Sequence, residues 1–133
     1  MSERPPIRVV AAILEREGKV FLARRPIHKQ QGGLWEFPGG KVDADETDAQ
    51  ALIREMLEEF GSAVVVGELL SESIHRYDFG QIRLVAYRAE LAQGDLEATE
   101  HAETRWVNFD ELRQIDLAPA DEEIRQTLLS AST

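Results

Sequence analysis

Three glutamates, Glu55, Glu58 and Glu59, lie within five residues of one another in a segment whose pattern predicts a helix. At about 100° per residue, their side chains project within roughly 100° of one another, and apolar residues take the opposite side. Carboxylates at this spacing repel one another unless a cation offsets them. Hard oxygen ligands on one rigid helix suit Mg²⁺, or Mn²⁺, which keeps other positions for water and phosphate oxygens. The glutamates are therefore candidate metal ligands, and the alternative is a solvated acidic helix face.

The residues around these glutamates form a longer motif. From residue 40 the chain reads G-x5-E-x7-R-E-M-x-E-E-x-G, which resembles the Nudix box, the defining motif of the Nudix hydrolases. So many fixed positions make this motif far more specific than a short glycine pattern. Ser62 departs from the aliphatic residue that ends the motif, and this departure concerns packing. The matching residues are Gly40, Glu46, Arg54, Glu55, Glu58, Glu59 and Gly61.

The Nudix resemblance implies a fold, a metal site and a set of supporting residues. The fold is an α/β/α sandwich with a mixed β-sheet, which covers residues 1–133 as a single domain. The carbonyl of Gly39 joins the three helix glutamates as a ligand of Mg²⁺, with Mn²⁺ as an alternative. Gly40, Glu46, Arg54 and Gly61 support the site, and we expect Arg54 to pair with Glu46 rather than to contact substrate.

A general base completes the expected site. Glu100 lies six residues before Trp106, where MutT-like enzymes carry a catalytic glutamate linked to metal. Glu58 is the second candidate, and the alternative for Glu100 is an ordinary acid of a surface loop. His75 and His101 have no partner at ligand spacing, so we leave both out of the metal site.

Two segments indicate the substrate class. Residues 23–26 and 33–41 resemble MutT-like nucleoside triphosphate pyrophosphohydrolases, of the CTP pyrophosphohydrolase and 8-oxo-dGTP diphosphatase types. The resemblance implies that Arg25 contacts substrate and that Phe37 lines the base pocket, although Phe37 could also be a core aromatic. Lys41 either faces the phosphates or is an exposed loop lysine. Asp121 either reads the base, accepting hydrogen bonds only, or stabilises the start of a helix.

The implied reaction is attack of water on a phosphorus of the triphosphate, which gives a nucleoside monophosphate and pyrophosphate. The expected substrates are oxidised or noncanonical deoxynucleotides such as 8-oxo-dGTP, or CTP and dCTP. One alternative is a Nudix hydrolase of another substrate with a nucleoside diphosphate linkage. Another is a non-catalytic module that senses a nucleotide, and the intact glutamates weigh against it.

Apolar alternation and turn residues predict the remaining elements. A hairpin of residues 7–14 and 20–23 is followed by a loop at 27–33, an extended segment at 35–37 and a turn at 38–40. The helix of the motif covers residues 47–60. Strands then cover residues 63–70, 74–77, 82–91 and 105–107, and helical segments cover residues 109–113 and 119–129.

Composition limits the partners and the location. The 133 residues include no cysteine, and 25 acidic against 15 basic residues give a net charge of −10. Such a charge disfavours nucleic acid and favours a nucleoside triphosphate that arrives as a metal complex. The sequence contains neither an apolar run long enough to span a membrane nor a signal peptide, so we expect a cytoplasmic protein, either a monomer or a homodimer.

Overall fold

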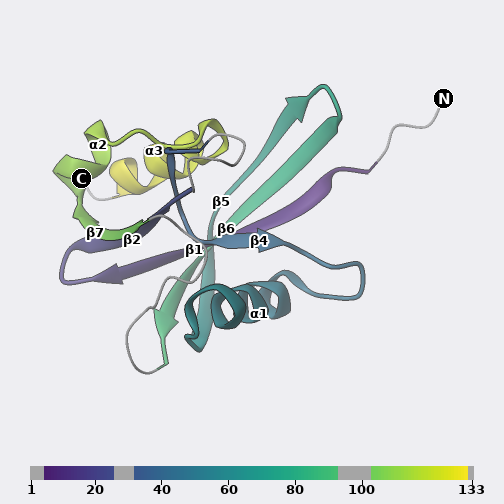
Figure 1. Ribbon diagram of the computed structural model, residues 1–133, viewed down its shortest axis with the longest axis horizontal. Helices are drawn as coiled ribbons and strands as arrows, with labels where there is room; N and C mark the ends of the chain where they lie inside the picture. Colours follow the sequence, from purple (N-terminus) through teal and green to yellow (C-terminus); the bar gives the residue numbers. More distant parts are fainter. Residues whose placement is uncertain (1–4, 26–31, 93–102, 132–133) are drawn as a thin grey trace.

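The computed structural model describes residues 5–25, 32–92 and 103–131 (Figure 1). Glu100, His101 and most of the expected loop at 27–33 lie outside the described residues. The strands are β1 (Ile7–Arg16), β2 (Lys19–Arg24), β3 (Trp35–Glu36), β4 (Gly39–Lys41), β5 (Val64–Tyr77), β6 (Gly80–Leu91) and β7 (Glu103–Asn108). The helices are α1 (Asp48–Phe60), α2 (Phe109–Gln114), the 3₁₀ turn η1 (Pro119–Asp121) and α3 (Glu122–Ala131).

The strands form one mixed sheet, as expected. Its main path runs β3-β2-β1-β6-β5, while β4 pairs with β1 and β7 pairs with β2. The central strand β1 is parallel to β6 and antiparallel to β2 and β4. Because successive side chains of β1 point to opposite faces, this strand contributes to a core on each side of the sheet.

Helices cover both faces of the sheet (Figure 1). On one face, β1 packs against α1, and Phe21 and Phe60 meet edge to face with ring centroids 5.5 Å apart. On the other face, the core contains Leu112 of α2 together with Ile124 and Leu128 of α3. The expected α/β/α sandwich is therefore confirmed.

Two expectations about the strands were wrong. The segments 63–70 and 74–77 form one strand, β5, because residues 71–73, where the apolar pattern breaks, keep a regular pairing with β6. Of the expected turn at 38–40, only Pro38 bends the chain. Gly39 and Gly40 are extended in β4, which pairs with β1 through the register Ala11↔Gly39 and Val10↔Gly40.

Caps fix both ends of α1. Thr47 accepts a hydrogen bond from the backbone N–H of Gln50, whose side chain in turn binds the backbone of Thr47. Gly61 ends the helix at φ 63°, a left-handed conformation that favours glycine. The next residue, Ser62, is buried, and its hydroxyl donates to the carbonyl of Phe60. This hydrogen bond explains how a polar residue fits at the position where the motif has an aliphatic one.

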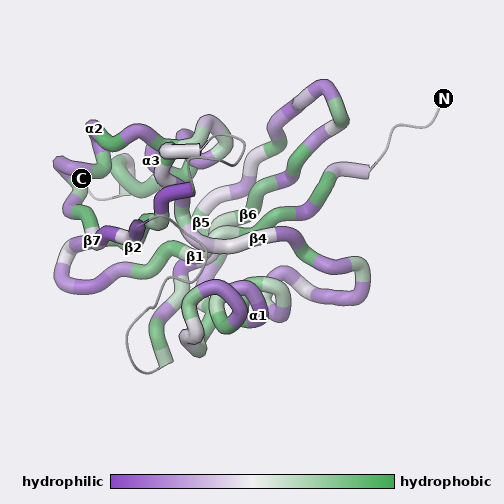
Figure 2. The backbone as a smooth tube through the Cα atoms, in the orientation of Figure 1, coloured by the Kyte–Doolittle hydropathy of each residue, from purple (hydrophilic) through white to green (hydrophobic). Residues whose placement is uncertain are grey.

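The helix between these caps is amphipathic. Figure 2 shows both hydrophilic and hydrophobic segments along α1. The side chains that α1 buries are Ala51, Leu52, Met56 and Phe60. The glutamates of the motif therefore lie on the part of the helix that the core does not cover.

Candidate active site

The backbone of β4 lies directly against the acidic helix. A Cβ atom added to Gly40 would lie 2.4 Å from Cδ of Glu55 and 2.6 Å from each of its carboxylate oxygens. A Cβ atom on Gly39 would lie 1.9 Å from the carbonyl oxygen of Val10. Neither position has room for a side chain: Gly40 lets the Glu55 carboxylate approach the main chain of β4, and Gly39 lets the backbone of β1 approach it.

Arg54 connects the loop before α1 to the acids on the helix. Its guanidinium donates two hydrogen bonds to the Glu46 carboxylate, at 2.7 and 2.8 Å, and a third to the carbonyl of Lys41 at 3.0 Å. Its Nη1 atom also reaches Glu55 at 3.0 Å and Glu58 at 3.3 Å. The pairing expected between Arg54 and Glu46 is present, and the same guanidinium partly neutralises two further acids.

The acids of this network differ in protonation behaviour. Hydrogen bonds from Arg54 and from the backbone N–H of Asp43 lower the pKa of Glu46 to about 2. Burial raises the pKa of Glu55, and the hydrogen bond from Arg54 only partly opposes this effect. The neighbouring charges of Glu58 and Asp43 also raise the Glu55 pKa. Glu55 is thus a desolvated acid next to other acids, an environment that additional positive charge would stabilise.

The expected metal ligands are close together but are not assembled around a common point. Among the described residues, no three acidic or histidine side chains converge as metal ligands. Glu55 and Glu58 bind Arg54 instead, while Glu59 lines a cavity. The side chain of Glu58 is 60% exposed and its contact with Arg54 is long, so this carboxylate can turn away easily. The oxygen donors and the excess negative charge fit a hard divalent cation.

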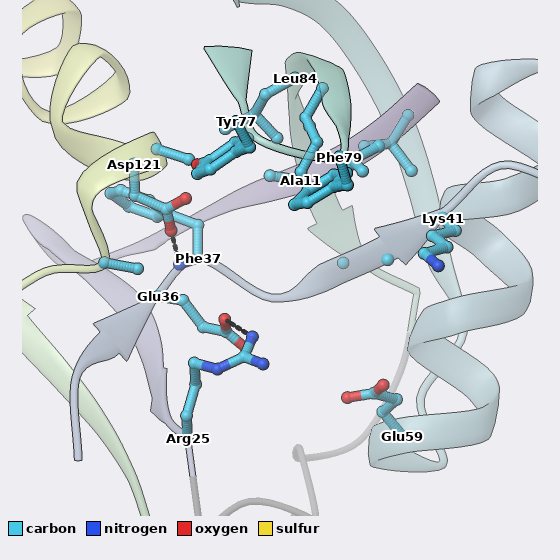
Figure 3. A pocket seen from close by; sticks show the side chains of 17 residues that line it. Ala11, Arg25, Glu36, Phe37, Lys41, Glu59, Tyr77, Phe79, Leu84 and Asp121 are labelled. Atoms are coloured by element: carbon cyan, nitrogen blue, oxygen red, sulfur yellow. Dashed lines mark hydrogen bonds and ion pairs between the residues drawn. The ribbon is translucent and has the colours of Figure 1, made fainter. Parts of the chain in front are cut away.

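A cavity of about 530 Å³ begins beside Glu59 and extends over the sheet. Figure 3 shows Lys41 and Glu59 at one end, the pair of Arg25 and Glu36 along one side, and aromatic rings at the far end. The volume falls in the range of pockets that enclose small ligands. The cavity therefore joins the acidic helix to an apolar compartment.

Aromatic residues form the far end of this cavity. Tyr77 ends β5, and Phe79 lies in the turn that leads to β6. Their rings stack with centroids 5.2 Å apart and planes 4° from parallel. Phe37, which Figure 3 shows beside Asp121, is buried and also belongs to the core. Phe37 is therefore a core aromatic that also lines the cavity, and its contact with a base stays a prediction.

Asp121 lies next to Phe37 and is only 7% exposed. Its Oδ2 atom accepts a hydrogen bond of 2.8 Å from the backbone N–H of Phe37. Within the described part of the chain, Oδ1 has no hydrogen-bond donor. Burial raises the pKa of Asp121 to about 7, against the opposing effect of the Phe37 hydrogen bond. A buried acid with a spare oxygen on a cavity wall is suited to bind a polar ligand atom.

The structure brings together the four residues expected to bind substrate. Arg25, Phe37, Lys41 and Asp121 all line the cavity. Arg25 also forms an ion pair of 2.9 Å with Glu36, a residue that sequence reasoning did not select.

Sequence reasoning also missed Tyr77 and Phe79. The sequence does place these two aromatic residues on either side of Asp78 in a predicted hairpin. Their stacking at the cavity, however, depends on the geometry of the turn, which the sequence does not show.

Comparison with known proteins identifies the family. Fold and motif together define a Nudix-type hydrolase. The NUDIX domain family matches residues 4–128, so the chain belongs to the NUDIX family. The CTP pyrophosphohydrolase of Escherichia coli strain K12 is 46% identical over 115 residues, which cover 86% of this chain and 85% of that protein.

A second relative and a solved structure support the same assignment. The 8-oxo-dGTP diphosphatase of Haemophilus influenzae is 34% identical over 125 residues, 93% of this chain and 92% of that protein. The solution structure of the E. coli ORF135 protein has a TM-score of 0.85 and 41% identity, covering 96% of this chain and 91% of that one. The expected resemblance to Nudix pyrophosphohydrolases is thereby confirmed. In the described residues, no helix has the length and apolar character needed to cross a membrane.

Proposed function

We propose that this chain is a Mg²⁺-dependent hydrolase that cleaves a nucleoside triphosphate into the nucleoside monophosphate and pyrophosphate. One observation carries the proposal: a single cavity joins the acidic helix of the Nudix box to a compartment with stacked aromatic rings and a buried carboxyl group. The names of two relatives point to CTP and 8-oxo-dGTP. The proposed substrates are therefore oxidised or noncanonical deoxynucleotides such as 8-oxo-dGTP, or CTP and dCTP.

The residues of α1 and β4 would hold the metal. Glu55, Glu58 and Glu59, with the carbonyl of Gly39, would bind Mg²⁺, or Mn²⁺ in its place. When bound, such an ion neutralises phosphate oxygens and lowers the pKa of a bound water. Glu100 remains the proposed general base, outside the described residues, with Glu58 as the alternative.

The residues of the cavity would orient the nucleotide. Lys41 lies at the end near the glutamates and is proposed to face the phosphates. The flat faces of Tyr77 and Phe79 are suited to a base, since every base offers a π surface to an aromatic ring. Arg25 would contact the substrate from the side wall, in an orientation that its ion pair with Glu36 holds.

Asp121 would read the edge of the base. In its ionised form the free oxygen only accepts hydrogen bonds and suits an amino group or a ring N–H. In its protonated form the carboxyl group can also donate. Because the pKa of Asp121 is about 7, both forms are populated near neutral pH. The protonation state of this residue is therefore expected to influence which base is preferred.

A panel of nucleotides tests the proposal. Purified protein with Mg²⁺ is incubated with CTP, dCTP, 8-oxo-dGTP and the four ordinary deoxynucleotides, and pyrophosphate and orthophosphate are measured separately. Pyrophosphate in equal amount to the nucleoside monophosphate is expected. Release of orthophosphate alone would reject the assigned bond.

The same panel distinguishes the two alternatives. Sugar nucleotides, dinucleoside polyphosphates and capped RNA are included, and faster turnover of one of them would assign another nucleoside diphosphate linkage. Tight binding of a nucleotide without any product, in both Mg²⁺ and Mn²⁺, would favour a sensing module. The cytoplasmic location, the single domain, the lack of nucleic-acid binding and the monomer or homodimer stay predictions.

A further inference from the structure

A second cluster of polar contacts holds the first turn of α1 against the sheet, outside the cavity. Asp48, the first residue of α1, receives hydrogen bonds from two different strands. Arg8 of β1 donates through Nη2 to Oδ1 at 2.8 Å, and Tyr87 of β6 donates its hydroxyl to Oδ2 at 2.8 Å. Since the Asp48 side chain is only 18% exposed, both contacts are partly shielded from solvent.

Arg8 binds both ends of the loop that precedes α1. Its backbone carbonyl accepts a hydrogen bond of 2.9 Å from the N–H of Val42, where the loop begins. Its guanidinium lies 3.4 Å from the carbonyl oxygen of Glu46, near the end of the loop. The carboxylate of Glu46 is the group that Arg54 binds in two places. The loop is thus held by the helix through Arg54 and by the sheet through Arg8.

The contacts of Asp48 with Arg8 and Tyr87 involve residues that the motif does not specify. Asp48 occupies a variable position between Glu46 and Arg54, and Arg8 and Tyr87 lie outside the motif. The contacts of Arg54 link α1 to Glu46 and, through the carbonyl of Lys41, to the end of β4. The contacts of Asp48 add separate links from the first turn of α1 to β1, which pairs with β4, and to β6.

We propose that Tyr87 and Arg8 are positioning residues, which act through Asp48 to hold the glutamates of α1 at the correct place against the backbone of β4. The proposal rests on the proposed function, because it assigns these glutamates to a divalent cation. Neither Tyr87 nor Arg8 is among the residues that line the cavity.

Tyr87→Phe tests the proposal with the least disturbance, because it removes only the hydroxyl and keeps the ring on the core around α1. Binding of Mn²⁺ is measured by the EPR signal of the free ion, without nucleotide, and thermal unfolding is measured in parallel. We expect the dissociation constant for Mn²⁺ to rise about tenfold, the lower end of the effect of groups that orient metal ligands. The KM for nucleotide at saturating metal should change less than about twofold.

Arg88→Gln is the matched control. Arg88 is the next residue of β6 and forms an ion pair of 2.7 Å with Glu15, away from the first turn of α1. This variant should bind Mn²⁺ as the wild type does. A Tyr87→Phe variant that binds Mn²⁺ within about twofold of the wild type would overturn the proposal, even if its melting temperature falls. An equal loss in Arg88→Gln would overturn it as well.

Asp48→Asn, alone and combined with Tyr87→Phe, tests whether Tyr87 acts through Asp48. If Tyr87 acts through Asp48, the double variant should bind Mn²⁺ about as weakly as the worse single variant, whereas independent effects would multiply. Multiplied effects would overturn the proposal. Failure of the proposed function would be recognised separately, because wild-type protein would then hydrolyse none of the nucleotides.

Discussion

Replacement of Asp121 by Asn should change how the stability of the protein depends on pH. Asp121 is buried, and its carboxyl group has a pKa of about 7 instead of 3.8. The folded state therefore holds a proton between these two pH values, whereas the unfolded state releases it. As pH rises through this window, the wild type loses unfolding free energy because ionisation stabilises the unfolded chain while the buried carboxyl group stays protonated. Asn cannot ionise, and its side-chain oxygen can still accept the hydrogen bond from Phe37.

The size of the effect follows from the pKa shift. A rise from 3.8 to about 7 corresponds to about 4 kcal/mol of unfolding free energy, at about 1.4 kcal/mol per pKa unit. The difference in stability, Asp121→Asn minus wild type, should therefore increase by about 4 kcal/mol between pH 4 and pH 8. The other titrating groups are common to both proteins, so the difference isolates Asp121.

Urea unfolding followed by tryptophan fluorescence measures this difference at several pH values. Asp110→Asn, at an exposed aspartate of α2, controls for the loss of an acid at the surface. Curves of stability against pH that run parallel for wild type and Asp121→Asn would refute the reasoning. In that case the carboxyl group ionises in the folded protein as easily as in the unfolded chain.

Three further predictions concern the acidic helix. Gly40→Ala should destabilise the protein by about 1–3 kcal/mol in urea unfolding and reduce turnover, because the new methyl group overlaps the Glu55 carboxylate. Glu58→Gln should lower kcat at least about a hundredfold in the pyrophosphate assay, while its melting temperature stays near that of the wild type. Glu46→Gln should be less stable than the wild type at pH 7, since the low pKa of Glu46 stabilises the fold. That last difference should be fully present above about pH 4.5 and disappear as pH falls to about 2, and a constant difference would contradict it.

The sequence predicts the helix of the motif well because the signals there are local. Thr47 and Gly61 mark its ends, and the periodicity separates buried residues such as Met56 from the acids. The pairing of Arg54 with Glu46 also follows from spacing along the chain. The helix ends, the periodicity and this ion pair all depend on residues that are close together in the sequence.

Other features depend on tertiary contacts and could not be predicted in this way. The continuous strand β5 exists because β6 pairs along its length, despite a local break in pattern. The stack of Tyr77 on Phe79 requires the geometry of one particular turn. The raised pKa of Asp121 requires burial beside a backbone N–H from a distant part of the chain.

The position of the stacked rings at the tip of the β5–β6 hairpin has an evolutionary consequence. The hairpin tip and the acidic helix come from separate stretches of sequence and meet only across the cavity. Under the proposed function, substitutions in the tip would alter which base fits without disturbing the groups proposed to act on the phosphates. An ancestral enzyme with this arrangement would then acquire new substrates while it kept one catalytic apparatus.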